Sequence, residues 1–385
     1  MKIVPVQTVK EIRAFHRLPF KIYSHNLNWI APLRQDIEKI FRSETNIRLH
    51  GDNAIRFLLY TDTGEIAGRI AAFIQYPFDN TLLKVGSIGF FECVNDLSAA
   101  EKLFDASRNW LEQRGCNVME GPVNFGERDR WWGLLVQGFD PPVYGMNYHL
   151  PYYKTLFESY GFQNYFEQYT FLLHRDRPMP KIVYEIKERL ELRNNVSFET
   201  ADKNDMQRFA RDFRIIYNKA WAHHDQVPEM TEAQSRKIMQ EVKPIMDPSL
   251  MIFAYVKNEP AGFFIGLPDA NQLLKYAKGN LNLTGVAKIL IRKPFIQMKH
   301  IYGIIFGVVP EHQNKGIEAG MAAKMHEMVN RSRYYEQIEL LWIGDFNKKM
   351  LNFVRHIQAE PYRTLITYRK NLDATLPFER CPPIE

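Results

Sequence analysis

Residues 307–321 read GVVPEHQNKGIEAGM, and this stretch predicts more about the fold than any other part of the chain. An apolar run precedes it, Pro310 bounds a turn, and Gly316 opens a segment with helical spacing. A strand, a glycine-containing loop and a helix in this order direct several backbone N–H groups at one point, where the helix dipole adds partial positive charge. The pattern indicates a unit that could hold a pyrophosphate, with Lys315 adding charge at its mouth.

Two familiar phosphate-binding patterns do not fit this loop. The signature GxxxxGK[ST] is absent, and so is the dinucleotide signature GxGxxG. An ordinary strand-to-helix turn, in which glycine is needed only for its shape, therefore remains an alternative on the loop alone.

The order of elements around this loop occurs twice along the chain. Each half predicts a hairpin, a strand, a helix, a strand, a helix and a last strand. In the first half these are 57–60 with 65–74, 85–91, a helix from Ser98 that ends before Gly115, 118–123, 151–160 and 165–173. In the second half they are 251–256 with 261–266, 302–309, 316–331, 339–343, 348–357 and 362–368.

This repeated order predicts an α/β protein with a mixed sheet, built from two copies of one unit. The polar segment 175–180 carries two prolines, and an amphipathic helix over 182–192 follows it. We expect a first domain over 1–174, a linker and bridging helix over 175–195, a second domain over 196–372 and a C-terminal tail over 373–385.

The stretch from Val308 to Met321 resembles motif A of the GNAT superfamily of CoA-dependent N-acyltransferases, written [QR]xxGx[GA]. Gln313 and Gly316 match the first and fourth positions, whereas Glu318 stands where the superfamily prefers a small residue. The resemblance extends over 196–370. In the first half, Trp29 to Leu33, residues 121–125 and residues 151–153 resemble uncharacterised bacterial tandem-GNAT proteins.

The resemblance implies an N-acyltransferase that moves an acyl group, expected to be acetyl, from acetyl-CoA or another acyl-CoA to a small-molecule or peptide amine. A non-catalytic acyl-CoA-binding protein, or a transferase for aminoacyl or long acyl groups, are the alternatives. The expected donor-binding residues are Phe306, Val308, Val309, Gln313, Asn314, Lys315, Gly316, Ile317, Ala319, Gly320 and Asn347. Many relatives carry a Tyr as proton donor a few residues beyond the Asn347 position, where this chain has Phe353.

The catalytic groups are not defined by any pattern. Asn347 and the adjacent pair His223 and His224, which precede Asp225, are the candidates, because a histidine beside a carboxylate can act as a base with its orienting group. A polar loop after a helix is the alternative interpretation, since adjacent side chains point apart. No third ligand has metal-site spacing, so we expect no metal.

The first half lacks the loop. Between its strand and its helix stand Cys93 to Ser98, without glycine and with Glu92 and Asp96 close by, which suits a pyrophosphate poorly. We therefore expect a degenerate copy. In the cluster over 128–132 we expect Trp131 and Trp132 to pack between the halves while the charged residues are solvated; an aromatic and basic lip over an anionic or acyl group is the alternative. Four tyrosines are also expected to pack between the halves: Tyr144, Tyr148, Tyr152 and Tyr153.

Composition excludes several other classes of protein. The chain has 385 residues, 45% of them hydrophobic, with a net charge of +6 and three cysteines, so a disulfide framework is not expected. Basic residues such as Arg292 and Lys293 are scattered, which favours solvated faces over a nucleic-acid site. Apolar runs fall short of a membrane span, and we expect a cytoplasmic protein.

Overall fold

Thirteen strands of the described chain form one mixed sheet. The structure is a computed structural model that describes residues 1–383 apart from 75–82, 127–129, 194 and 222–228. The strand order is β1-β2-β3-β4-β5-β13-β7-β12-β11-β10-β9-β8, with β6 paired to β13. Two pairs, β4 with β5 and β11 with β12, are parallel, and the other pairs are antiparallel.

The strands are β1 (Lys2–Pro5), β2 (Ala54–Tyr60), β3 (Ile66–Ile74), β4 (Val85–Cys93), β5 (Val118–Gly121), β6 (Leu134–Gln137), β7 (Gln163–His174), β8 (Val196–Thr200), β9 (Met251–Val256), β10 (Glu259–Pro268), β11 (His300–Val308), β12 (Gln337–Gly344) and β13 (Glu360–Asn371). The helices are α1 (Val9–Ile22), α2 (Arg34–Ile40), α3 (Leu97–Glu112), α4 (Tyr153–Ser159), α5 (Lys181–Leu192), α6 (Met206–Trp221), α7 (Glu232–Val242), α8 (Asn271–Leu274), α9 (Leu283–Arg292), α10 (Ile317–Arg331) and α11 (Lys348–His356). Short 3-10 turns are η1 (Pro248–Leu250), η2 (Lys275–Ala277), η3 (Lys293–Phe295) and η4 (Pro310–His312).

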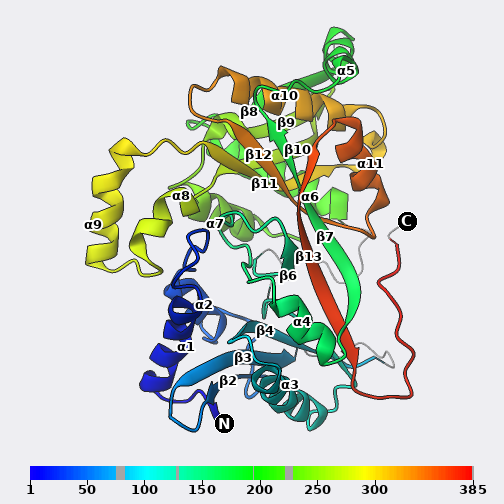
Figure 1. Ribbon diagram of the computed structural model, residues 1–385. Coiled ribbons are helices and arrows are strands. Elements are labelled where there is room, and N and C mark those ends of the chain that lie inside the picture. Colours follow the sequence, from blue (N-terminus) through cyan, green and yellow to red (C-terminus); the bar gives the residue numbers. More distant parts are fainter. Residues whose placement is uncertain (75–82, 127–129, 194, 222–228, 384–385) are drawn as a thin grey trace.

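The two halves of the chain exchange their last strands. Strand β7 ends the first half but pairs with β12, and β13 ends the second half but pairs with β5. The two exchanged strands also pair with each other along most of their length, and they run side by side through the middle of the molecule (Figure 1). The halves predicted over 1–174 and 196–372 are therefore joined by one continuous sheet.

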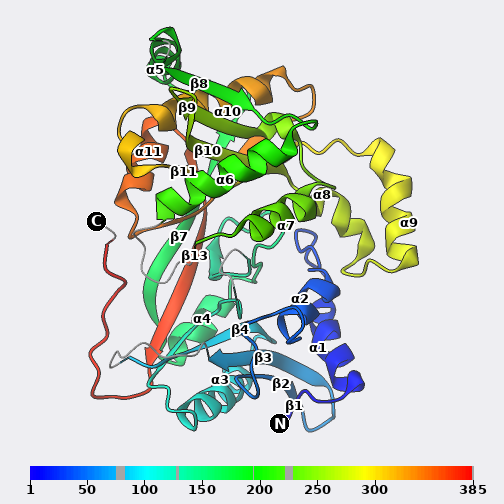
Figure 2. The same cartoon turned by 180° about the vertical axis from the view of Figure 1, so that it is seen from behind.

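In the second half, helices cover both faces of the sheet. One face packs against α5, α10 and α11, through residues such as Val183, Met321 and Val354. The other face packs against α6 and α7, through Phe209 and Met239. Figure 2 shows α6 and α7 on that second face. Packing on both faces of the sheet holds β11 and the start of α10 in place, and the predicted loop lies between these two elements.

The predicted α/β class and the doubled order of hairpin, strand and helix are confirmed. The start of α3 is a correction: the helix begins at Leu97, and Asp96 rather than Ser98 caps it by accepting a hydrogen bond from the Ala99 N–H at 3.1 Å. The structure also contains helices α1, α2, α7 and α9, which were not predicted from the sequence. None of the helices in the described ranges is long and apolar enough to cross a membrane.

Candidate functional site

Strands β11 and β12 separate along their length. They pair in parallel over His300–Gly303 and Gln337–Leu340, and their pairing ends there. A bulge in β12, where Trp342 has φ 50°, shifts its register against β7 and coincides with this divergence. On its other side β11 stays paired with β10 as far as Val308. The segment Ile304–Val308 thus has one strand edge facing the gap, which is the splayed geometry implied by the resemblance.

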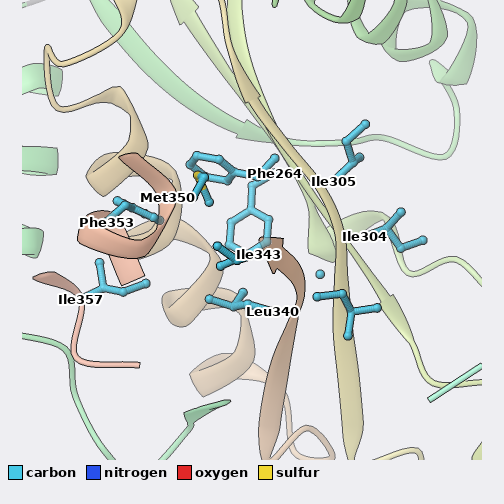
Figure 3. Close-up of a pocket in the computed structure, with 11 residues that line it drawn as sticks. Phe264, Ile304, Ile305, Leu340, Ile343, Met350, Phe353 and Ile357 are labelled. Atoms are coloured by element: carbon cyan, nitrogen blue, oxygen red, sulfur yellow. The ribbon is translucent and has the colours of Figure 1, made fainter. Parts of the chain in front are cut away.

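The gap between the strands is an apolar cleft. It holds about 410 Å³ of empty space, counting the part that opens to solvent. Every lining side chain is apolar, and the lining residues are Phe264, Gly303, Ile304, Ile305, Phe306, Leu340, Leu341, Ile343, Met350, Phe353 and Ile357. In Figure 3, Met350 and Phe353 come from α11 on one side, with Ile357 directly after that helix, and Leu340 and Ile343 come from β12.

Three aromatic rings form one wall of this cleft. Phe306 stacks on Phe353 with ring centroids 5.2 Å apart, and Phe264 meets Phe306 edge to face at 5.3 Å. Phe353 is the residue that stands where many relatives have a tyrosine, and here its ring packs instead of supplying a hydroxyl group. The cleft therefore offers apolar contact, and its lining contains no titratable side chain.

The glycine-containing loop follows directly from the free edge of β11. The Gln313 side chain donates a hydrogen bond to the Val308 carbonyl at 3.0 Å and so ties the loop to the strand. Asn314 and Gly316 both have positive φ, 60° and 88°. A side chain at Gly316 would also meet Ile186 of α5 at 2.7 Å, so this position requires glycine. Helix α10 begins at the next residue, with its N-terminal N–H groups at the loop.

Glu318 points back to this loop. Its carboxylate accepts a hydrogen bond from the Asn314 N–H at 3.2 Å. The departure from motif A thus has a structural role, because the carboxylate satisfies a donor that would otherwise point to solvent or to an anion. Lys315, the cation of the loop, is exposed.

Most of the remaining predicted donor-binding residues have side chains that pack inside the protein. Val308, Ile317 and Ala319 pack in the core beneath α10, and Val309 packs in the core on the opposite face. A side chain at Gly320 would clash with Phe198, so this glycine permits close packing of α10 on β8. The side chains of these residues are therefore used for packing within the protein.

The predicted catalytic candidates are not brought together. Asn347 precedes α11 and caps it, since its side-chain oxygen accepts the Met350 N–H at 3.1 Å. His223 and His224 lie outside the described residues, as does Asp225. Within the described ranges, no three His, Cys, Asp or Glu side chains gather in a way that could hold a metal ion.

The equivalent place in the first half is filled with protein. Past the pairing of β4 with β5, the Val123 N–H still reaches the Ile88 carbonyl at 2.8 Å. At the end of β4, Glu92 is buried and accepts hydrogen bonds from the hydroxyl groups of Tyr23 and Tyr153 at 2.8 and 2.6 Å. Burial raises the pKa of Glu92. With Asp96 used as a helix cap, both carboxylates of this segment have structural roles.

The aromatic clusters agree only in part with the prediction that they pack between the halves. Tyr148 does so, in a core with Leu267 and Tyr302, and the Tyr144 N–H donates to Asp269 at 3.0 Å. Trp132 contacts Phe166 of β7, which contacts Phe346 of the second half. For Trp131 the prediction was wrong, because it packs within the first half. Tyr152 and Tyr153 join a core made mainly of first-half residues, to which the exchanged strand β13 contributes Ile366 and Tyr368.

The whole chain has the tandem GNAT fold. It superposes on a GCN5-related N-acetyltransferase from Sphaerobacter thermophilus with TM-score 0.53 at 11% identity, over 99% of this chain and 98% of that one. A tandem GNAT protein from the clavulanic acid biosynthesis pathway gives TM-score 0.52 at 10% identity, over 97% and 98%.

Two relatives resemble the chain along nearly its full length. One is named bacterial ceramide synthase, from Caulobacter vibrioides, with 27% identity over 97% of this chain and 98% of that protein. The other is Protein YghO of Escherichia coli, with 26% identity over 94% and 93%. No family model matches the chain.

Proposed function

We propose that this protein is an acyl-CoA N-acyltransferase whose donor site lies in the second half. The free edge of β11 would pair with the pantetheine arm, and the loop around Gly316 would hold the pyrophosphate. One observation carries the proposal: the unpaired edge of β11 lines the apolar cleft, and the chain runs from this edge directly into the glycine-containing loop at the start of α10. The GNAT fold of the solved neighbours supports acyl transfer in general.

We propose a long acyl group rather than acetyl. An acetyl group needs no apolar cleft, whereas a fatty acyl chain gains free energy from each methylene group it buries. The lining described above consists of aliphatic and aromatic side chains alone. The relative named bacterial ceramide synthase supports this choice, because ceramide is the amide of a fatty acid and a long-chain amino alcohol. A long-chain amino alcohol is accordingly the acceptor that we propose.

In the proposed reaction, the amine nitrogen attacks the thioester carbon, the new C–N bond forms and the C–S bond breaks. The amine loses a proton and the CoA thiolate gains one. Because the cleft lining contributes no acid or base, the contribution of these residues is to hold the thioester beside the amine and to exclude water. Holding two reactants in the reactive geometry can by itself supply a large part of the rate enhancement.

The donor assignment is tested by calorimetry with acetyl-CoA and decanoyl-CoA. We expect decanoyl-CoA to bind more tightly, and we expect Gly316→Trp to abolish binding of both, because the new side chain meets Ile186 and requires a strained φ. Circular dichroism checks that the variant is folded. Failure of every acyl-CoA to bind the unmodified protein would overturn the assignment.

Transfer is tested by following release of the CoA thiol from decanoyl-CoA with sphinganine and with short amines. We expect release with the long-chain amine. Tight binding without thiol release across the amine panel would instead favour a non-catalytic acyl-CoA-binding protein. The packing of Phe353 on Phe306, in place of a tyrosine hydroxyl, is the observation that favours this second candidate.

A further inference from the structure

Helix α9 stands out from the side of the molecule in both views (Figures 1 and 2). It lies in the long connection between β10 and β11, after α8 and η2 and before η3. Its apolar side chains are largely exposed, which is unusual for a helix of a globular protein. The exposed fractions are 91% for Leu283, 41% for Val286, 60% for Leu290, 67% for Ile291 and 84% for Phe295 in η3.

The exposed apolar residues of α9 share one face of the helix. Leu283, Val286, Leu290 and Ile291 follow the spacing i, i+3, i+7 and i+8, which places them along one stripe. Gly285 lies on the other side and is buried, and a side chain there would collide with the Asn280 carbonyl at 2.0 Å. The helix thus packs through its glycine and turns its apolar stripe to solvent, the reverse of the usual arrangement.

The charge of this segment has one sign. Between Ala270 and His300 the chain contains no Asp or Glu. The same stretch contains six cations: Lys275, Lys278, Lys288, Arg292, Lys293 and Lys299. Three of them, Lys288, Arg292 and Lys293, lie within or directly after α9, and Arg292 also lies 5.1 Å from the ring of Tyr276. Lys299 lies farther along and pairs with Glu336 at 2.6 Å. The stripe is therefore bordered by positive charge without a compensating carboxylate in its own segment.

The protruding segment is fastened at its base. The Arg34 N–H donates to the Gly279 carbonyl at 2.8 Å, and the Asn271 side chain donates to the Pro142 carbonyl at 2.8 Å. Asn282 caps α9 by accepting the Gly285 N–H at 2.9 Å. The helix is thus formed and oriented before any partner binds, which lowers the entropic cost of docking.

We propose that α9 and η3 dock on the surface of a bilayer that contains anionic lipids. A helix with an apolar stripe and flanking Lys and Arg residues lies in the membrane interface, with the stripe among the acyl chains and the cations at the head groups. Exposed aliphatic residues together with the positive charges of Lys288, Arg292 and Lys293 favour this occupant over a protein groove. The inference rests on this surface and not on the acyl-transfer proposal.

The proposal is tested by flotation of the full chain with vesicles of phosphatidylcholine mixed with phosphatidylglycerol, against vesicles of phosphatidylcholine alone. We expect binding to the mixed vesicles that weakens as salt is added. The double variant Leu290→Glu with Ile291→Glu should lower the bound fraction at least about tenfold, because it places carboxylates in the stripe. Leu192→Glu is the matched control, since Leu192 is 80% exposed on α5, and should bind as the unmodified protein does.

A second double variant, Lys288→Gln with Lys293→Gln, removes two positive charges and leaves the apolar stripe unchanged. It should lose the preference for anionic vesicles. All three variants involve residues outside the cleft, and circular dichroism checks their folding. The proposal is overturned if the unmodified protein binds neither vesicle, or if the Leu290 and Ile291 variant binds equally well. Self-association in the absence of lipid that this variant abolishes would also overturn it, in favour of a second copy of the chain as the occupant.

Discussion

The carboxylate of Glu318 accepts a hydrogen bond from the backbone N–H of Asn314 at 3.2 Å, inside the loop proposed to hold a pyrophosphate. A bound pyrophosphate would face this negative charge and compete with it for the same N–H group. Two like charges about 4 Å apart in water repel each other by about 1 kcal/mol. In the absence of a ligand the Glu318 carboxylate therefore occupies the Asn314 N–H group, and a bound pyrophosphate would have to displace it.

Replacing this carboxylate should tighten donor binding. We expect Glu318→Gln to raise the affinity for acetyl-CoA roughly fivefold at low salt, which corresponds to about 1 kcal/mol. The amide keeps an acceptor for the Asn314 N–H and loses only the charge. Calorimetry measures the effect, and Glu101→Gln, an exposed residue on α3 of the first half, is the control. Unchanged or weaker binding by the Glu318 variant would contradict this account.

The exposed lysine of the same loop should have the opposite effect. We expect Lys315→Glu to weaken acetyl-CoA binding by about tenfold or more at low salt, because the charge facing the pyrophosphate is reversed. The loss should shrink as ionic strength rises. Lys203→Glu, an exposed substitution in the loop after β8, should have little effect. An affinity of the Lys315 variant that equals that of the unmodified protein at low salt would argue against this position of the pyrophosphate.

Local patterns were sufficient to predict the repeated order of elements and the strand, glycine-containing loop and helix over 302–331. Pro310 and Gly316 mark the turn and the helix start, and the apolar run before them is β11. The exchange of β7 and β13 could not be predicted in this way. Both strands have the pattern of a strand that returns to its own sheet, and the edge each one joins is decided by tertiary contacts such as the buried pair of Arg363 and Glu339.

The direction of the Glu318 side chain and the presence of helix α9 also could not be predicted from the sequence, for different reasons. The direction of the Glu318 side chain depends on a rotamer choice that a motif does not encode. Helix α9 was missed because its apolar residues face outward, whereas sequence interpretation assumes that an apolar stripe faces the core. Gly285 within the helix and Pro294 after it weaken the helical signal further. Arg292 and Lys293 were expected to lie on a solvated face, and both are exposed.

The apolar cleft predicts selectivity for acyl length. Met350 lies on α11 and contributes to the lining, so Met350→Trp should fill part of the space. We expect this variant to lose decanoyl-CoA binding at least about tenfold while acetyl-CoA binding persists, because burial of roughly 0.8 kcal/mol per methylene is lost. Met350→Leu preserves the volume and should bind both donors. Equal losses for the two donors would show that the acyl chain lies elsewhere.

The exchanged strand β13 is held to β12 of the second half by a buried ion pair. Arg363 of β13 donates from Nε to Glu339 of β12 at 2.8 Å, and it also donates to the carbonyl groups of Gly138, Asp140 and Pro141. Arg363→Met leaves a buried carboxylate and three carbonyl groups without this partner. We expect the free energy of unfolding to fall by about 3–5 kcal/mol. Urea denaturation measures it, Glu339→Gln should cost less, and an unchanged midpoint would contradict the role of the pair.

The pH dependence of stability should reveal a second buried contact between the halves. Asp269 follows β10 and accepts the N–H groups of Tyr144 and Asn271, both at 3.0 Å. Burial raises the pKa of Asp269 from 3.8 to about 7. The native state therefore holds this proton more tightly than the unfolded chain does, so stability is greatest below the unfolded pKa and is lost as pH rises towards about 7.

Asp269→Asn removes this dependence, because the amide oxygen accepts both N–H groups and never ionises. We expect the variant and the unmodified protein to have similar unfolding free energies near pH 4. Above about pH 7 the variant should be more stable, by up to about 4 kcal/mol, since each pKa unit is worth about 1.4 kcal/mol. Urea denaturation across this range measures the difference. Parallel pH profiles of the two proteins would mean that the carboxylate ionises without cost, and that the contact between Asp269 and the Tyr144 loop is open to water.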